Sequence, residues 1–170
     1  SVISPNELDV YVPSHRFAIE CHGLYWHSEF VGCPSDKHEQ KRIAAAKCNV
    51  RLLQLFEDEW YDRRAIVESL IATRLNVNTR SIHARKCTIV EVDLQDAREF
   101  MDMNHIDGHV NCSNALGLMF DDQLVAVATT RRPRHDKWRD HTEIARLAFA
   151  SKMRVVGGVS RLINAIRKRH

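Results

Sequence analysis

Two short apolar runs near the start of the chain constrain the fold of this region more than any other feature. Residues 7–12 and 16–21 are rich in β-branched and aromatic side chains, which favour strands. Between them the sequence Pro-Ser-His-Arg at 13–16 is typical of a turn. The first run contains Asp9, with Glu7 at its start, and the second contains Glu20. A hairpin would therefore place the carboxylates of Asp9 and Glu20 toward one end of a sheet.

The sequence after this pair predicts alternating helix and strand. Residues 37–48 contain neither Gly nor Pro and follow Asp36, a favourable helix cap, so we expect a helix there. Residues 50–56 form an apolar run typical of a strand. An apolar stripe then predicts a second helix over residues 58–75. These elements together predict a mixed α/β unit over residues 1–78.

A polar link over residues 76–81 separates this unit from a second one, which we place at residues 82–170. The order of elements changes after the link. The second unit is expected to contain, in order, a strand at 86–92, a helix at 94–105 opened by Asp93, a hairpin of 114–120 and 123–130, a strand at 143–149, a Gly-containing turn and a terminal helix.

Charge and composition limit the classes of function. The formal net charge is +3, and from residue 151 to the end every charged side chain is basic, which permits a polyanionic partner. No apolar run approaches the ~20 residues that a membrane span requires, so we expect no membrane partner. The five cysteines form no Cys-x-x-Cys pair, which favours free thiols in a reducing cytoplasm.

The predicted hairpin carries the residue types that metal-dependent phosphodiester hydrolysis requires. Asp9 and Glu20 offer carboxylate oxygens, the ligands that Mg²⁺ or Mn²⁺ prefers. His22 follows Glu20 by two residues, where such sites often carry a lysine. The imidazole of His27 is suited to deprotonate an attacking water near neutral pH. On the expected helix, Lys41 lies either near the phosphate or on a solvated face.

The string from Ile19 to His27, Ile-Glu-Cys-His-Gly-Leu-Tyr-Trp-His, makes this site more specific. Together with Asp9 it resembles the catalytic strand pair of the very-short-patch-repair endonucleases and of the related EDxHD homing endonucleases of phages, within the PD-(D/E)xK nuclease superfamily. The resemblance covers about residues 7–75. It implies that Asp9 binds Mg²⁺, that His22 and His27 act in catalysis, and that the substrate is double-stranded DNA.

Departures from the repair enzymes favour the phage branch. Leu24 and Glu29 stand where the repair enzymes have ligands of a structural zinc, so the resemblance implies no such zinc here. Glu20 stands where the repair enzymes have an apolar residue and the wider superfamily has an acid. The family also has an acid on a helix before the first strand. That residue would precede Ser1, so we expect flanking segments outside this sequence.

The second unit resembles the first half of a GNAT-type acyltransferase. In that family a loop of the form Arg/Gln-x-x-Gly-x-Gly/Ala holds the coenzyme A pyrophosphate, and Arg154-Val-Val-Gly-Gly-Val matches all but its last position. A partial GNAT-like domain is therefore expected. The unit also has a basic segment with Trp138, suited to phosphate contact and base stacking. Its candidate DNA-binding residues are Arg131, Arg132, Arg134 and Lys137.

The sequence thus predicts a PD-(D/E)xK-like nuclease core followed by a partial GNAT-like domain. The expected activity is Mg²⁺-dependent DNA cleavage by a phage or mobile-element endonuclease, acting in the cytoplasm of the host cell. Two alternatives stay open. In the first, the chain is an acyltransferase that acts on a nucleic acid or protein amine. In the second, it is a DNA-binding module without catalysis, in which Asp9 and Glu20 have no chemical role.

Overall fold

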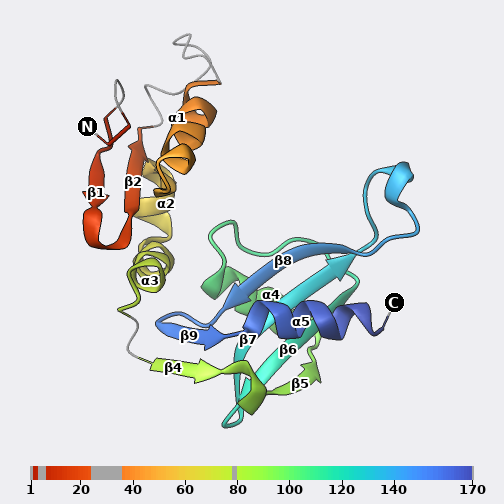
Figure 1. Cartoon of the computed structure of the whole chain (residues 1–170). Helices are drawn as coiled ribbons and strands as arrows, with labels where there is room; N and C mark the ends of the chain where they lie inside the picture. Colours follow the sequence, from red (N-terminus) through yellow and green to blue (C-terminus); the bar gives the residue numbers. More distant parts are fainter. Residues whose placement is uncertain (1, 4–6, 24–35, 78–79, 170) are drawn as a thin grey trace. The chain divides into compact units, whose positions relative to one another are not determined.

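A computed structural model describes residues 2–3, 7–23, 36–77 and 80–169. Within these residues the chain is mixed α/β, with five α-helices and three sheets (Figure 1). It divides into two compact units, Ser1–Val67 and Glu68–His170, each described here by itself. The boundary between the two units falls inside a helix. It precedes the polar link over residues 76–81, where the sequence predicts the boundary. None of the described helices is both long and apolar enough to cross a membrane.

The first unit is built on a three-stranded sheet with the order β1-β2-β3. Strands β1 (Val10–Val12) and β2 (Phe17–His22) are antiparallel, which confirms the predicted hairpin. A 3-10 turn, η1 (Pro13–His15), joins them, and Arg16 completes it in the left-handed region at φ 45°. Strand β3 (Arg51–Phe56) lies parallel to β2, so β2 is the central strand.

Helix α1 (Asp36–Lys47) connects the two parallel strands and covers one face of the sheet. Ala45 on this helix is fully buried and belongs to a cluster with Ala18 of β2 and Val50. Side chains alternate between the two faces of a strand, so Glu20 and His22 lie on the same face as Ala18. This packing directs one side of α1 toward the acidic end of β2.

The single helix expected over residues 58–75 is wrong, because the structure has two helices there, α2 (Glu57–Asp62) and α3 (Arg64–Leu75). Arg63 between them has φ −126° and ψ 26°, outside the helical region. Its carbonyl accepts hydrogen bonds from the N–H groups of Ile66 and Val67, so it opens α3 as a new helix. The apolar stripe continues across both helices, which is why periodicity did not reveal the break.

The second unit contains a four-stranded antiparallel sheet with the order β5-β6-β7-β8. Its strands are β5 (Thr88–Glu91), β6 (Asn114–Phe120), β7 (Gln123–Arg131) and β8 (Glu143–Phe149). The predicted hairpin of β6 and β7 is confirmed, and Asp121 and Asp122 both have positive φ in its two-residue turn.

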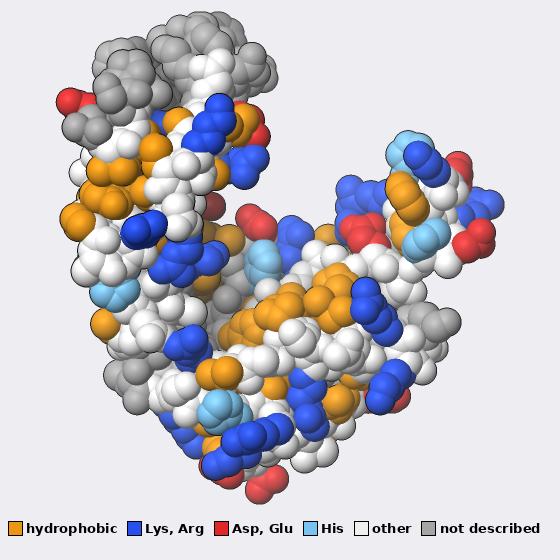
Figure 2. All heavy atoms as spheres, in the orientation of Figure 1, with side chains coloured by type: hydrophobic (Ala, Val, Ile, Leu, Met, Phe, Trp, Pro, Cys, Tyr) orange, Lys and Arg blue, Asp and Glu red, His pale blue; other side chains and the backbone are white. Residues whose placement is uncertain are grey.

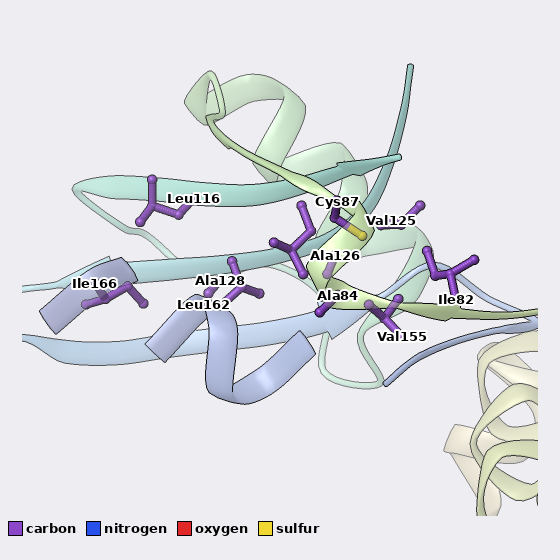
Figure 3. Packing of buried hydrophobic residues seen from close by; sticks show 11 residues of the cluster. Ile82, Ala84, Cys87, Leu116, Val125, Ala126, Ala128, Val155, Leu162 and Ile166 are labelled. Carbon is purple, nitrogen blue, oxygen red and sulfur yellow. The ribbon is translucent and has the colours of Figure 1, made fainter. Parts of the chain in front are cut away.

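Helices α4 (Leu94–Asn104) and α5 (Gly158–Arg167) cover opposite faces of this sheet. Phe100 and Met101 of α4 pack with Val127 of β7. Leu162 of α5 packs with the next residue of that strand, Ala128 (Figure 3). Consecutive residues of a strand face opposite sides. As expected, Asp93 caps α4, and its carboxylate accepts a hydrogen bond from the N–H of Gln95.

A short parallel pair, β4 (Arg80–His83) and β9 (Met153–Val156), completes the second unit and was not predicted. Residues 76–81 were interpreted as a link, and the segment before α5 as a turn. Each strand contributes a single buried apolar residue, Ile82 and Val155, which lie opposite each other. One buried residue gives no detectable alternation in sequence.

Candidate active site

The carboxylates of Asp9 and Glu20 lie together at one end of the first sheet. Val10 pairs with Ile19, so Asp9 stands opposite Glu20 where β1 begins. The N–H of Asp9 donates to Oε1 of Glu20 at 3.2 Å, and the N–H of Cys21 donates to Oδ2 of Asp9 at 2.8 Å. Each carboxylate is thereby fixed by a backbone donor on or beside the opposite strand. The predicted juxtaposition of the two acids is present in the structure.

Lys41 of α1 forms an ion pair with Glu20 and is the third member of this cluster. The Glu20 residue is 3% exposed, whereas the Lys41 side chain is 24% exposed. Lys41 precedes the buried Ala45 by four residues, so both lie on the side of α1 that faces the sheet. The sequence indicated Lys41 as a possible phosphate contact but did not indicate its pairing with Glu20. The available signal was its i, i+4 spacing to an apolar core residue.

The structure describes only the first of the two histidines of the predicted site. His22 is 5% exposed, and its ring lies 5.2 Å from that of Phe56, with the ring planes tilted by 48°. It shares the face of β2 that carries Glu20. His27 lies outside the described residues. The structure therefore brings together Asp9, Glu20 and Lys41, with His22 two residues farther along the same strand.

The pKa of the Cys21 thiol depends on the charges of this cluster. The sequence did not indicate Cys21 as part of the site. Burial raises the pKa of the Cys21 thiol, and the negative charges of Asp9 and Glu20 raise it further. Cys21 is nevertheless exposed, so reagents can reach it. A change in charge at the two carboxylates should therefore change the reactivity of this thiol.

The donor set of this cluster fits Mg²⁺. Among the described residues no group of three His, Cys, Asp or Glu side chains is placed to hold a metal ion, so this part of the chain offers two carboxylates. Mg²⁺ commonly binds through one or two carboxylates and keeps several waters, and it does not need a complete protein cage. Asp9 is exposed, which leaves room for such waters.

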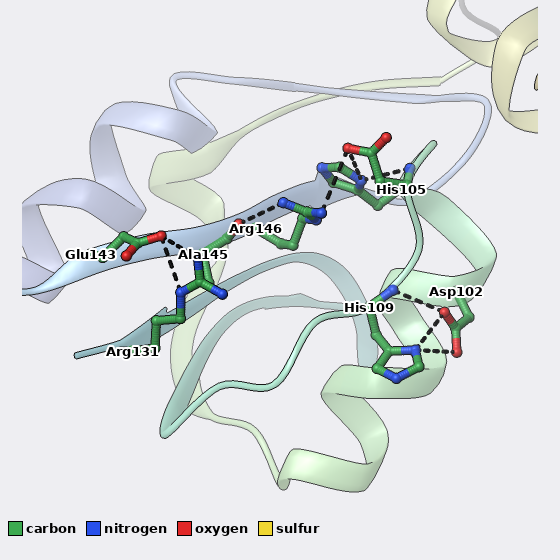
Figure 4. A network of polar contacts seen from close by, with 8 residues as sticks. Asp102, His105, His109, Arg131, Glu143, Ala145 and Arg146 are labelled. Carbon is green, nitrogen blue, oxygen red and sulfur yellow. Dashed lines mark hydrogen bonds and ion pairs between the residues drawn. The ribbon is translucent and has the colours of Figure 1, made fainter. Parts of the chain in front are cut away.

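The basic residues near the end of β7 differ in their surroundings. The Nε and Nη2 atoms of Arg131 donate to Oε1 of Glu143 on β8 at 3.0 and 2.5 Å (Figure 4). The hydrogen bond from Arg131 lowers the pKa of Glu143. Arg131 is also only partly exposed, so its main contact is a cross-strand ion pair. The predicted contact of Arg131 with DNA would therefore have to form while its ion pair with Glu143 is kept.

The segment beyond β7 is more open. Arg132, Arg134 and Lys137 are exposed, as the predicted contact with DNA requires. The ammonium of Lys137 lies 5.3 Å from the centre of the Trp138 ring, and Trp138 is 49% exposed. An exposed aromatic ring among cations is suited to contact a nucleic acid.

Comparisons of the chain with protein-family models, with curated proteins and with solved structures find no match.

Proposed function

We propose that this chain is a metal-dependent DNA endonuclease that hydrolyses phosphodiester bonds, with Asp9 and Glu20 as ligands of Mg²⁺ or Mn²⁺. The observation that carries the proposal is the cluster of two carboxylates and a lysine at one end of the first sheet. Two acids on neighbouring strands with a nearby cation provide metal ligands and positive charge for a phosphate. The string from Ile19 to His27 adds the resemblance to the homing and repair endonucleases.

The arrangement of elements supports the proposed nuclease core. A hairpin of β1 and β2 carries the two acids, and α1 crosses over to the parallel strand β3. The second unit supports a partial GNAT-like domain, because β5, α4 and the strands β6 to β8 follow one another in the order expected for that fold. The second unit also contains the parallel pair of β4 with β9, which the order of elements inferred from the sequence did not include.

The side chains of the cluster have distinct proposed roles. Asp9 and Glu20 hold the ion, which when bound would stabilise charge on the scissile phosphate and lower the pKa of a water molecule. Lys41 orients the Glu20 carboxylate and adds positive charge beside the two acids. His27 is the proposed acceptor of the proton from water, on the strength of the resemblance.

Supercoiled plasmid provides the test of this activity. The purified chain should convert it to nicked or linear DNA in Mg²⁺ or Mn²⁺, and should leave it intact in EDTA. Gel electrophoresis over a time course measures the conversion. Cleavage at the same rate in EDTA, or no cleavage with either metal, would contradict the proposed function.

The Cys21 thiol gives a test of metal binding that does not depend on cleavage. A divalent cation between Asp9 and Glu20 would offset the negative charge that raises the pKa of this thiol. The lower pKa should increase the rate of alkylation by iodoacetamide at pH 7.5 about two- to five-fold in Mg²⁺, because the thiolate is the reactive form. Mass spectrometry of the peptide that contains Cys21 measures the rate.

Cys48 is the internal control for this experiment, because it is also exposed and its thiol donates a hydrogen bond to a backbone carbonyl, that of Val2. Its alkylation rate should be the same in Mg²⁺ and in EDTA. Equal rates for Cys21 under both conditions would argue against a metal ion at the two acids.

A further inference from the structure

A pocket in the second unit is lined by basic side chains and contains no acid. It has a volume of about 570 Å³ and lies where η3 (Ala84–Lys86) and β5 meet α5. Arg85, Arg161 and Lys168 line it, together with His83. The hydroxyl of Ser160 and the amide of Asn164 add neutral polar groups. Three permanent positive charges and no carboxylate among the lining residues favour an anionic occupant.

These cations differ from five arginines of the second unit, which have acidic partners. Arg80 pairs with Asp121, Arg131 with Glu143, Arg139 with Asp136, Arg146 with Asp107, and Arg169 with Glu91. Within the described part of the chain, Arg85 and Lys168 have no ion-pair partner, and both side chains are exposed. Figure 2 shows Lys and Arg side chains gathered over η3 and along α5.

Arg161 forms a fixed part of the pocket wall. Its Nη2 donates to the carbonyl of Cys87 at 2.9 Å, which holds the guanidinium beside the end of η3. Its Nε is buried and has no hydrogen-bond partner among the described residues. The Nη2 contact with Cys87 therefore fixes the positive charge of Arg161 in the pocket wall.

The two glycines at the start of α5 have structural reasons of their own. Gly157 has φ 77°, which favours glycine, and a Cβ at Gly158 would lie 2.5 Å from Cε1 of Phe149. Close packing of α5 on the sheet therefore explains the second glycine without any ligand. The basic lining of the pocket, rather than the Gly-Gly turn, carries the inference.

We propose that this pocket binds phosphate groups, and that their source is the backbone of the DNA that the first unit cleaves. The choice of DNA rests on the proposed function. It is favoured because Arg85 and Lys168 are exposed, and because each is next in the chain to a further exposed cation, Lys86 and Arg167 respectively. A backbone with a phosphate at every nucleotide matches such a surface better than one isolated phosphate.

Binding of a fluorescein-labelled 20-base-pair duplex, measured by anisotropy in EDTA, tests the pocket without cleavage. Arg85→Ala and Lys168→Ala should each weaken binding about eight-fold at 0.1 M salt, because each phosphate contact contributes about 0.9 to the slope of log K against log salt. The double variant should lower that slope by about 2. Both side chains are exposed, so the variants should keep the fold, and circular dichroism checks this.

Arg98→Ala is the matched control. Arg98 is an exposed arginine of α4, on the face of the same sheet opposite α5, and its removal changes the net charge equally. Its effect on affinity should be less than two-fold. An unchanged salt slope in the double variant, or an equal loss in Arg98→Ala, would overturn the proposal.

Coenzyme A is the probe for a soluble phosphate ester. Micromolar binding of coenzyme A by calorimetry that the double variant loses, with DNA affinity unchanged, would overturn DNA as the source. Cleavage of plasmid in Mg²⁺ separates this proposal from the nuclease function. If the variants show the predicted salt slopes and the wild-type protein does not cleave plasmid, the phosphate-binding pocket is supported and the nuclease function is contradicted. If the protein cleaves plasmid and the salt slopes are unchanged in the variants, the nuclease function is supported and the pocket is contradicted.

Discussion

Replacing Lys41 with alanine is expected to destabilise the first unit by about 3 kcal/mol, because it leaves the carboxylate of Glu20 buried without its cation. The effect should be local to this unit. Hydrogen exchange of the β2 amides, measured by mass spectrometry, should become about 100-fold faster, since exchange of a core strand follows the free energy of opening. The same variant should cleave DNA more slowly, because Lys41 orients a proposed metal ligand.

Mg²⁺ should restore part of the protection lost in Lys41→Ala. A cation bound at Asp9 and Glu20 would offset the charge that Lys41 no longer offsets, and a ligand that binds only the folded state stabilises it. The wild-type protein should gain less protection from Mg²⁺, because its Glu20 already has a partner.

Arg42→Ala is the control for Lys41→Ala, since it removes one positive charge from the next position of α1. Arg42 pairs with Glu39, and both side chains are more than half exposed, so their pairing is screened by water. No measurable change in the exchange of β2 is expected. Equal effects of the two substitutions would show that the ion pair of Lys41 with Glu20 has no special role in stability.

Much of the first unit could be predicted because its signals are local. Pro13 and the residues after it mark the turn, and the flanking apolar runs define the two strands. Once β1 and β2 pair across this turn, Asp9 and Glu20 are forced to lie opposite each other. The acidic half of the candidate site therefore follows from sequence alone.

The contribution of α1 to the site could not be predicted in the same way. The pairing of Lys41 with Glu20 depends on how the helix is rotated about its axis, which the packing of Ala45 against Ala18 determines. The spacing of Lys41 to Ala45 is compatible with that rotation, but Ala44, Ala45 and Ala46 are equally apolar, so the sequence does not select Ala45 as the residue that is buried. The pairing of β4 with β9 is similarly non-local, because it joins segments about seventy residues apart, such as Ile82 and Val155.

Asp9→Asn is expected to have the largest effect on activity. The asparagine side chain keeps an oxygen that can accept the hydrogen bond from the N–H of Cys21, so the hairpin should be retained. It loses the negative charge that holds a divalent cation. If the ion contributes about 4 kcal/mol to stabilising the transition state, the rate should fall about 1,000-fold.

The matched control is Glu7→Gln, which neutralises an exposed acid two residues before Asp9. Glu7 is not part of the cluster, and its loss should leave the rate within two-fold of the wild-type value. The Cys21 reporter applies to both variants. Mg²⁺ should accelerate alkylation of Cys21 in Glu7→Gln but not in Asp9→Asn.

Single-turnover cleavage of plasmid in Mg²⁺, measured side by side for the wild-type protein, Asp9→Asn and Glu7→Gln from parallel purifications, tests the central claim most directly. The proposed site predicts cleavage by the wild-type protein and by Glu7→Gln, and a rate about 1,000-fold lower for Asp9→Asn. Cleavage by Asp9→Asn at the wild-type rate would contradict the assignment of Asp9 as a metal ligand and the active site built on it.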